Sequence, residues 1–174
     1  MLRKNLQVNN RVTFSEMLLK TSPEDLTKRR KYLREEHGFT LQQQKYIARL
    51  KPDFLMYDKD PNKGIDALSK LFVQKYGMSK DLVKTLVLKY PQILNKSDNA
   101  ISNFFDYMKQ NKKVDELTTM KLVFDVPLLL TTDVPSQSKE IEELFEVYHG
   151  ISADEVTQIF LAFPYLYCCQ TLKI

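Results

Sequence analysis

Apolar residues recur in adjacent pairs along this chain, and each pair lies five and four positions before a proline. The pairs are Ile47-Ala48, Leu86-Val87, Leu122-Val123 and Ile159-Phe160. Such a pair predicts the buried face of a helix. Proline disfavours helical geometry in the residue before it and lacks an N–H donor, so the helices should end at Pro52, Pro91, Pro127 and Pro164.

A glycine lies fourteen residues before three of these prolines, at Gly38, Gly77 and Gly150. The chain has only four glycines, so the spacing indicates a repeat. Each of the three stands where a preceding helix should end, and glycine readily adopts the left-handed conformation that satisfies the last carbonyl groups of a helix. The third copy has Lys113 in this place and is the weakest.

A capping residue follows each of these four sites by two positions. The caps are Thr40, Ser79, Asp115 and Ser152. Thr40 with Gln43, and Ser152 with Glu155, form the pattern of a capping box. The clearest copy of the whole unit is 77–94, which ends in Tyr-Pro-Gln-Ile-Leu.

A second helix is predicted after each of the first three proline turns. These helices should start at Pro61, at Ser97, and at Pro135 or Ser136. A further helix should begin at Ser22-Pro23, where a capping serine, a proline and two acids coincide, and should run to His37. The expected core residues of the three second helices are Ile65, Leu68, Leu71, Phe72, Ile101, Phe104, Phe105, Met108, Ile141, Leu144, Phe145 and Tyr148.

The repeat period of 39, 36 and 37 residues between prolines is typical of stacked helical units that complete one another's core. We therefore predict an all-α tandem helical-repeat superhelix, a solenoid of about three and a half units. The expected division is a basic N-terminal arm at 1–21 and a single repeat domain at 22–174. The arm is rich in Lys and Arg and almost free of acids, which fits either an uncleaved mitochondrial targeting segment or an ordinary basic arm.

Charge is unevenly distributed along the sequence. Lys and Arg outnumber Asp and Glu by eleven to five in residues 1–50 and by ten to seven in 51–110, but are outnumbered five to ten in 111–174. The candidate contacts with phosphate or with an acidic partner are Lys28, Arg29, Arg30, Lys31, Arg34, Lys45 and Lys84. The alternative is that the dense run from Lys28 to Arg34 is a solvated helix face.

The residues that enzymes use are missing from the expected patterns. The sequence has no glycine-rich phosphate loop and no His-Glu-x-x-His motif, and both histidines stand just before a repeat glycine, where a helix C-terminus favours them. Cys168 and Cys169 are adjacent, which suits neither a normal disulfide nor a zinc site. We expect no catalytic residue, no metal and no cofactor.

The pattern of turn, capped helix, apolar-x-x-Pro-x-x-Leu and second helix resembles the repeat of the mitochondrial transcription termination factor (mTERF) family. The resemblance covers about residues 38–167, and Leu88-Lys89-Tyr90-Pro91-Gln92-Ile93-Leu94 matches best. It implies a helical superhelix in a mitochondrion or plastid that usually binds DNA or RNA along a basic groove. Here the chain is shorter than typical nucleic-acid-binding members, and its last third is acidic.

The repeat, the charge distribution and the family resemblance leave two alternative functions. The favoured one is a non-catalytic scaffold, an accessory subunit of a large assembly in the mitochondrial matrix, such as the ribosome or a respiratory complex, with other protein chains as partners. Its expected protein interface is Phe163, Tyr165, Leu166 and Tyr167. The alternative is a regulator of mitochondrial transcription or translation that binds RNA or DNA.

Overall fold

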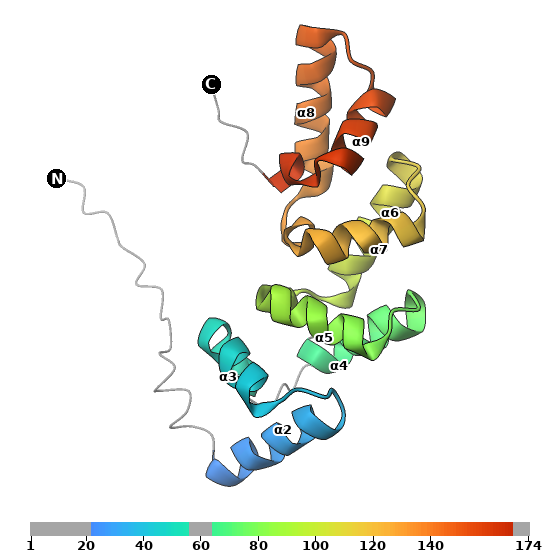
Figure 1. The fold of residues 1–174 in the computed structure, drawn as a ribbon. Helices are drawn as coiled ribbons and strands as arrows, with labels where there is room; N and C mark the ends of the chain where they lie inside the picture. Colours follow the sequence, from blue (N-terminus) through green and yellow to red (C-terminus); the bar gives the residue numbers. More distant parts are fainter. Residues whose placement is uncertain (1–21, 56–63, 169–174) are drawn as a thin grey trace, which may run out of the picture.

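The computed structural model describes residues 22–55 and 64–168, which form helices and no strand. The helices stack one pair above another in chain order, from α2 to α8 and α9 (Figure 1). This arrangement is the helical-repeat architecture that the sequence predicts. The α-helices are α2 (Pro23–Glu35), α3 (Leu41–Leu50), α4 (Gly64–Lys70), α5 (Lys80–Lys89), α6 (Asp98–Asn111), α7 (Glu116–Asp125), α8 (Val134–His149) and α9 (Ala153–Ala162).

Each unit begins at a residue in the left-handed conformation. Gly38, Gly77 and Gly150 have φ of 66°, 68° and 64°, and Lys113 has φ of 54° in the unit that lacks the glycine. The four expected caps are confirmed, because the side chains of Thr40, Ser79, Asp115 and Ser152 each accept a hydrogen bond from the backbone N–H three residues later. Both predicted capping boxes are present.

The prolines act as expected on the helices that precede them. Short 3₁₀ turns begin at each one: η1 (Pro52–Leu55), η3 (Pro91–Asn95), η4 (Pro127–Thr131) and η5 (Pro164–Cys168). The third residue after each proline is buried: Leu55, Leu94, Leu130 and Tyr167. Tyr167 is only 1% exposed and packs its ring at 4.3 Å from that of Phe160. It therefore belongs to the core of its unit and not to an exposed protein interface as expected, because it stands at this core position of the repeat.

The second helices differ from the prediction in detail. The expected start at Pro61 lies outside the described residues, and α4 passes into a π-helical segment, η2 (Leu71–Lys75). The helix α6 starts after Ser97 as predicted, whereas α8 starts at Val134 because Asp133 caps it. The helix α2 ends at Glu35, two residues before the expected end at His37.

Adjacent units are joined by a recurring pair of side chains. The residue directly before each left-handed residue contacts the residue eight positions before the next one, and we call these contacts junction pairs. The pairs are a hydrogen bond between His37 and Ser69, an aromatic stack of Tyr76 on Phe105 with ring centroids 4.0 Å apart, and an ion pair between Lys112 and Glu142. The same position of the repeat thus holds a hydrogen bond, an aromatic stack and an ion pair at the three junctions.

A second recurring contact lies near the prolines. The residue before a proline bonds to the fourth residue after the next proline. Lys51 Nζ donates to Asn95 Oδ1 at 2.6 Å, and the hydroxyl groups of Tyr90 and Thr131 lie 3.1 Å apart. The first two junctions therefore each have two such contacts.

The helix α8 departs from the expected burial. Leu144 and Tyr148 were expected in the core but are 46% and 74% exposed, and Phe145 is half-buried. In the earlier units the helix that precedes the left-handed residue is covered by the next unit. Within 22–55 and 64–168 the last unit consists of α9 and η5 and has no second helix, so this face of α8 stays exposed.

Replacing Gly77 by valine should lower the free energy of unfolding by about 1–2 kcal/mol or more, because a β-branched residue is strained at φ of 68°. A Cβ atom at this position would meet no heavy atom within 4 Å, so the loss would come from the backbone and not from a clash. Chemical denaturation would measure it. Gly77→Asn is the control and should lose less, since asparagine tolerates this conformation. Equal losses in both variants would contradict the account.

Candidate functional site

The basic cluster of α2 lies on one exposed helix surface, with one exception. Lys28, Arg30, Lys31 and Arg34 are exposed to solvent. Arg29 is only 8% exposed, and its guanidinium lies 5.3 Å from the centre of the Tyr32 ring. Its Nη1 atom is 3.8 Å from Asp66 Oδ2. Arg29 was expected to contact a phosphate or an acidic partner, but the phase of α2 turns it toward α4, where it neutralises an acid of its own chain.

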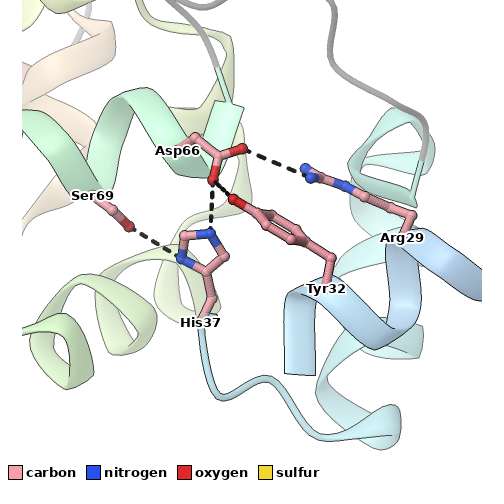
Figure 2. A network of polar contacts seen from close by, with 5 residues as sticks. All are labelled: Arg29, Tyr32, His37, Asp66 and Ser69. Carbon is pink, nitrogen blue, oxygen red and sulfur yellow. Dashed lines mark hydrogen bonds and ion pairs between the residues drawn. The ribbon is translucent and has the colours of Figure 1, made fainter. Parts of the chain in front are cut away.

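Asp66 connects α2 to α4 through a polar network (Figure 2). The Tyr32 hydroxyl donates to Asp66 Oδ1 at 2.5 Å, and His37 Nε2 lies 2.9 Å from the same oxygen. The other ring nitrogen, His37 Nδ1, is 3.3 Å from the Ser69 hydroxyl. No pattern in the sequence pointed to Asp66, although His37 and Ser69 occupy the junction positions of the repeat.

The electrostatics of this network favour an ionised Asp66. Hydrogen bonds from His37 and then Tyr32, together with the nearby charge of Arg29, lower the pKa of Asp66 to about 2. The hydrogen bond to Asp66, followed by burial, raises the pKa of Tyr32 to about 12. The lowered pKa of Asp66 contributes stability above pH 4, which is lost as the pH falls toward 2, and the raised pKa of Tyr32 contributes stability that is lost as the pH rises from 10 toward 12.

Ser69, His37 and Asp66 form a hydrogen-bonded chain, which invites comparison with a catalytic triad. The attachment is reversed, because a triad serine bonds to Nε2 of its histidine and the acid to Nδ1. Ser69 lies near the end of α4, where helical hydrogen bonds use the backbone N–H groups that an oxyanion hole would need. The side chain of His37 is 9% exposed. The network is therefore a structural clamp between the first two units.

Asp66→Asn should lower the free energy of unfolding by about 1 kcal/mol at pH 7, since the variant loses charge-assisted hydrogen bonds at a half-exposed site. The difference from the parent protein should shrink as the pH falls from 4 toward 2, where Asp66 itself becomes protonated. Urea denaturation across this range would measure both effects. Asp81→Asn, on a side chain that is 90% exposed, should show neither. A difference that is constant with pH would contradict the assignment.

The two remaining basic candidates differ in exposure. Lys45 is exposed on α3. The side chain of Lys84, a candidate contact with phosphate or an acidic partner, is only 22% exposed, and its Nζ atom lies 3.1 Å from Asp81 Oδ1. The same atom would lie 3.5 Å from a Cβ atom at Gly38, so Lys84 reaches the turn before α3. In the two later units the corresponding residues are Met120 and Thr157, which carry no charge.

The apolar candidates at η5 are split by the 3₁₀ turn. Phe163 and Tyr165 are 66% and 61% exposed, Leu166 is half-buried, and Tyr167 is buried as described above. In the earlier units the residue that corresponds to Leu166 is at most 4% exposed: Phe54, Ile93 and Leu129. The end of the described chain therefore presents apolar side chains that the earlier units cover with the next unit.

The fold, the repeat and its junctions define a helical-repeat protein, and comparison with known families matches residues 66–173 to the mTERF family. This match spans well over half of the chain, which therefore belongs to the mTERF family. Members of the family are organellar helical-repeat proteins that bind nucleic acid and are not known as enzymes. A search of the curated proteins found no match.

Two further observations bear on the class of protein. None of the helices in the described part of the chain is long and apolar enough to span a membrane. The same residues contain no group of three or more His, Cys, Asp or Glu side chains that could hold a metal ion. The described surfaces that offer chemistry are the basic face of α2 and α3, the exposed apolar residues of α8, and those at η5.

Proposed function

We propose that the chain is a non-catalytic scaffold, an accessory structural subunit of a large assembly in the mitochondrial matrix, such as the ribosome or a respiratory complex. Other protein chains are its partners, and Phe163, Tyr165 and Leu166 contact one of them. The family match supports an organellar helical-repeat protein, and the properties of the two exposed surfaces favour the scaffold.

The observation that carries the proposal is the position of the most exposed apolar side chains. Among the described residues, the four large apolar side chains that are more than 60% exposed are Val147, Tyr148, Phe163 and Tyr165. Val147 and Tyr148 lie on α8, and Phe163 and Tyr165 lie at the end of α9 and in η5. Both pairs fall in the last third of the chain, where the net charge of the sequence is negative. Exposed apolar side chains of this kind are typical of protein interfaces, and the negative charge of this part of the sequence disfavours nucleic acid.

The scaffold is tested by purifying the native protein from mitochondria under mild conditions and measuring its sedimentation. The protein should migrate with a large particle. Phe163→Ser together with Tyr165→Ser should reduce the co-migrating fraction at least about tenfold, because a central apolar contact is worth 1.4 kcal/mol or more. Leu117→Ser, at a residue that is 58% exposed on α7, is the matched control and should keep the fraction unchanged. A native protein that migrates alone would overturn the proposal.

The second candidate is a nucleic-acid-binding regulator of mitochondrial transcription or translation. The exposed side chains of Lys28, Arg30, Lys31 and Arg34 favour it, together with Lys45 on the adjacent helix. Such a surface can neutralise phosphates and release their counterions. It covers the first units only, because the later units lack the corresponding basic residues.

Changing Lys28, Arg30, Lys31 and Arg34 to glutamine separates the two functions. If the protein binds duplex DNA or RNA through this face, affinity at low salt should fall, and the slope of log affinity against log salt should flatten by about 0.7–0.9 for each lost phosphate contact. Fluorescence anisotropy with labelled oligonucleotides would measure both. The matched control changes four exposed lysines elsewhere, Lys80, Lys109, Lys121 and Lys139, by the same charge. The scaffold predicts weak binding with equal slopes in both variants.

A further inference from the structure

The helix α8 carries an apolar stripe that the earlier units lack. Leu144, Val147 and Tyr148 are 46%, 76% and 74% exposed. Their spacing of three and four residues places them on one side of the helix. The stripe occupies the C-terminal half of α8, whereas the segment that follows α9 lies near the N-terminal end of α8 (Figure 1).

The repeat itself shows that this stripe is unusual. The two residues that stand three and two positions before the first three left-handed residues are Glu35-Glu36, Gln74-Lys75 and Gln110-Asn111. All six are exposed, although the next unit covers another side of the same helix. Before the last left-handed residue, Gly150, the corresponding residues are Val147 and Tyr148. Stacking of the chain's own units therefore requires no apolar residue at these two positions.

Beside the stripe, α8 has a second side that is buried on the equivalent helices α2, α4 with η2, and α6. Five residues before the left-handed residue stand Leu33, Phe72 and Met108, each 0% exposed, whereas Phe145 is half-buried. The residue directly before the left-handed residue is also buried or nearly buried at the three junctions: His37, Tyr76 and Lys112. His149, which has the same position on α8, is exposed, and its one ring contact among the described residues is with Phe145. Part of α8 thus has the form of a helix-on-helix junction whose covering helix is not among the described residues.

We propose that the stripe on α8 docks an amphipathic helix of a partner protein, with basic residues along its flank; this rests on the proposed scaffold function. The docked segment is a helix because, at each of the three internal junctions, the residue that contacts the end of the preceding helix lies on a helix of the next unit. It belongs to another protein because the chain's own units leave the positions of Val147 and Tyr148 polar.

The charge of α8 specifies the flank of the partner helix. Glu140, Glu143 and Glu146 are exposed, and Lys139 is the helix's one lysine, with its Nζ atom 3.9 Å from Glu143. Lys or Arg side chains beside the apolar stripe of the partner would complement these acids and fix the orientation of the helix. At His149 the junction pairs predict a hydrogen-bonding side chain, as Ser69 is for His37.

Site-specific photocrosslinking in the native particle tests the proposal. A photoreactive phenylalanine analogue replaces Tyr148 in the full chain, and in a matched control it replaces Asn111, the exposed residue at the same position of the preceding unit. After irradiation, mass spectrometry identifies the crosslinked peptides. We expect the Tyr148 variant to crosslink at least tenfold more than the Asn111 variant, to a helical, Lys- or Arg-flanked segment of a different protein.

Several results would overturn the inference. They are a crosslink from Tyr148 to a second copy of this chain, to residues 169–174, to RNA or to an acidic segment, or equal yields from the two positions. The proposed function is judged separately by migration of the unmodified protein. A protein that migrates with a large particle but gives no crosslink at Tyr148 would contradict only the docking on α8, whereas migration alone would contradict the scaffold itself.

Discussion

Replacing Leu86 by alanine is expected to lower the free energy of unfolding by about 2–5 kcal/mol. The side chain of Leu86 is 0% exposed on α5, and its neighbour Val87 is also fully buried. Removing three carbon atoms there loses the transfer free energy of the side chain and leaves a cavity that packed neighbours can fill only in part. Chemical denaturation with an unchanged m-value would measure the loss.

The same helix offers a matched control. Leu82 is 44% exposed on α5, so Leu82→Ala removes the same atoms from a site that is already partly in water. It should cost less than about 1 kcal/mol, since surface substitutions usually change stability little. Comparable losses in the two variants would mean that α5 is rotated relative to the phase described above.

Much of the fold could be predicted because it depends on local rules. The left-handed turn, the cap and the proline each act on residues within one helical turn, so Gly77, Ser79 and Pro91 define the bounds of α5 from the sequence alone. Lys113 shows the strength of the pattern, since it adopts the left-handed conformation of the repeat without being glycine. The π-helical segment at Leu71–Lys75 had no such local signal.

The candidate sites could be predicted less well because they depend on contacts between units. Arg29 sits in a cluster of five basic residues, and only its packing toward Asp66 on another helix shows that it is buried. Leu144 and Tyr148 have core spacing but lie exposed, since burial requires a covering helix as well as a suitable side chain. The junction pairs join residues about 30 positions apart, and their chemistry differs at every junction.

The junction of Lys112 with Glu142 gives the second large expected effect. The side chain of Lys112 is 4% exposed and that of Glu142 23% exposed, and Ser138 also donates to Glu142 at 2.6 Å. Burial lowers the pKa of Lys112. Glu142→Gln should lower the free energy of unfolding by about 3 kcal/mol, because it leaves a buried charge without its partner. This lies at the low end of the usual range, since Lys112 stands at the C-terminus of α6, where helix carbonyls favour a cation.

The stability loss in Glu142→Gln should depend on pH and on which residue stands at position 112. A loss caused by poor packing alone would depend on neither. A lysine whose pKa is lowered in the folded state destabilises the protein most when it is charged, so the deficit of Glu142→Gln should narrow as the pH rises toward 10.5. The Tyr76–Phe105 stack supplies the rescue, because it fills the same position of the preceding junction with an aromatic pair. Lys112→Tyr combined with Glu142→Phe should return to within about 1 kcal/mol of the parent protein, since apolar pairs often replace buried ion pairs without loss. Denaturation of both variants at pH 7 and pH 10 would measure these effects, and a double variant as unstable as Glu142→Gln would show that the three junctions do not share one geometry.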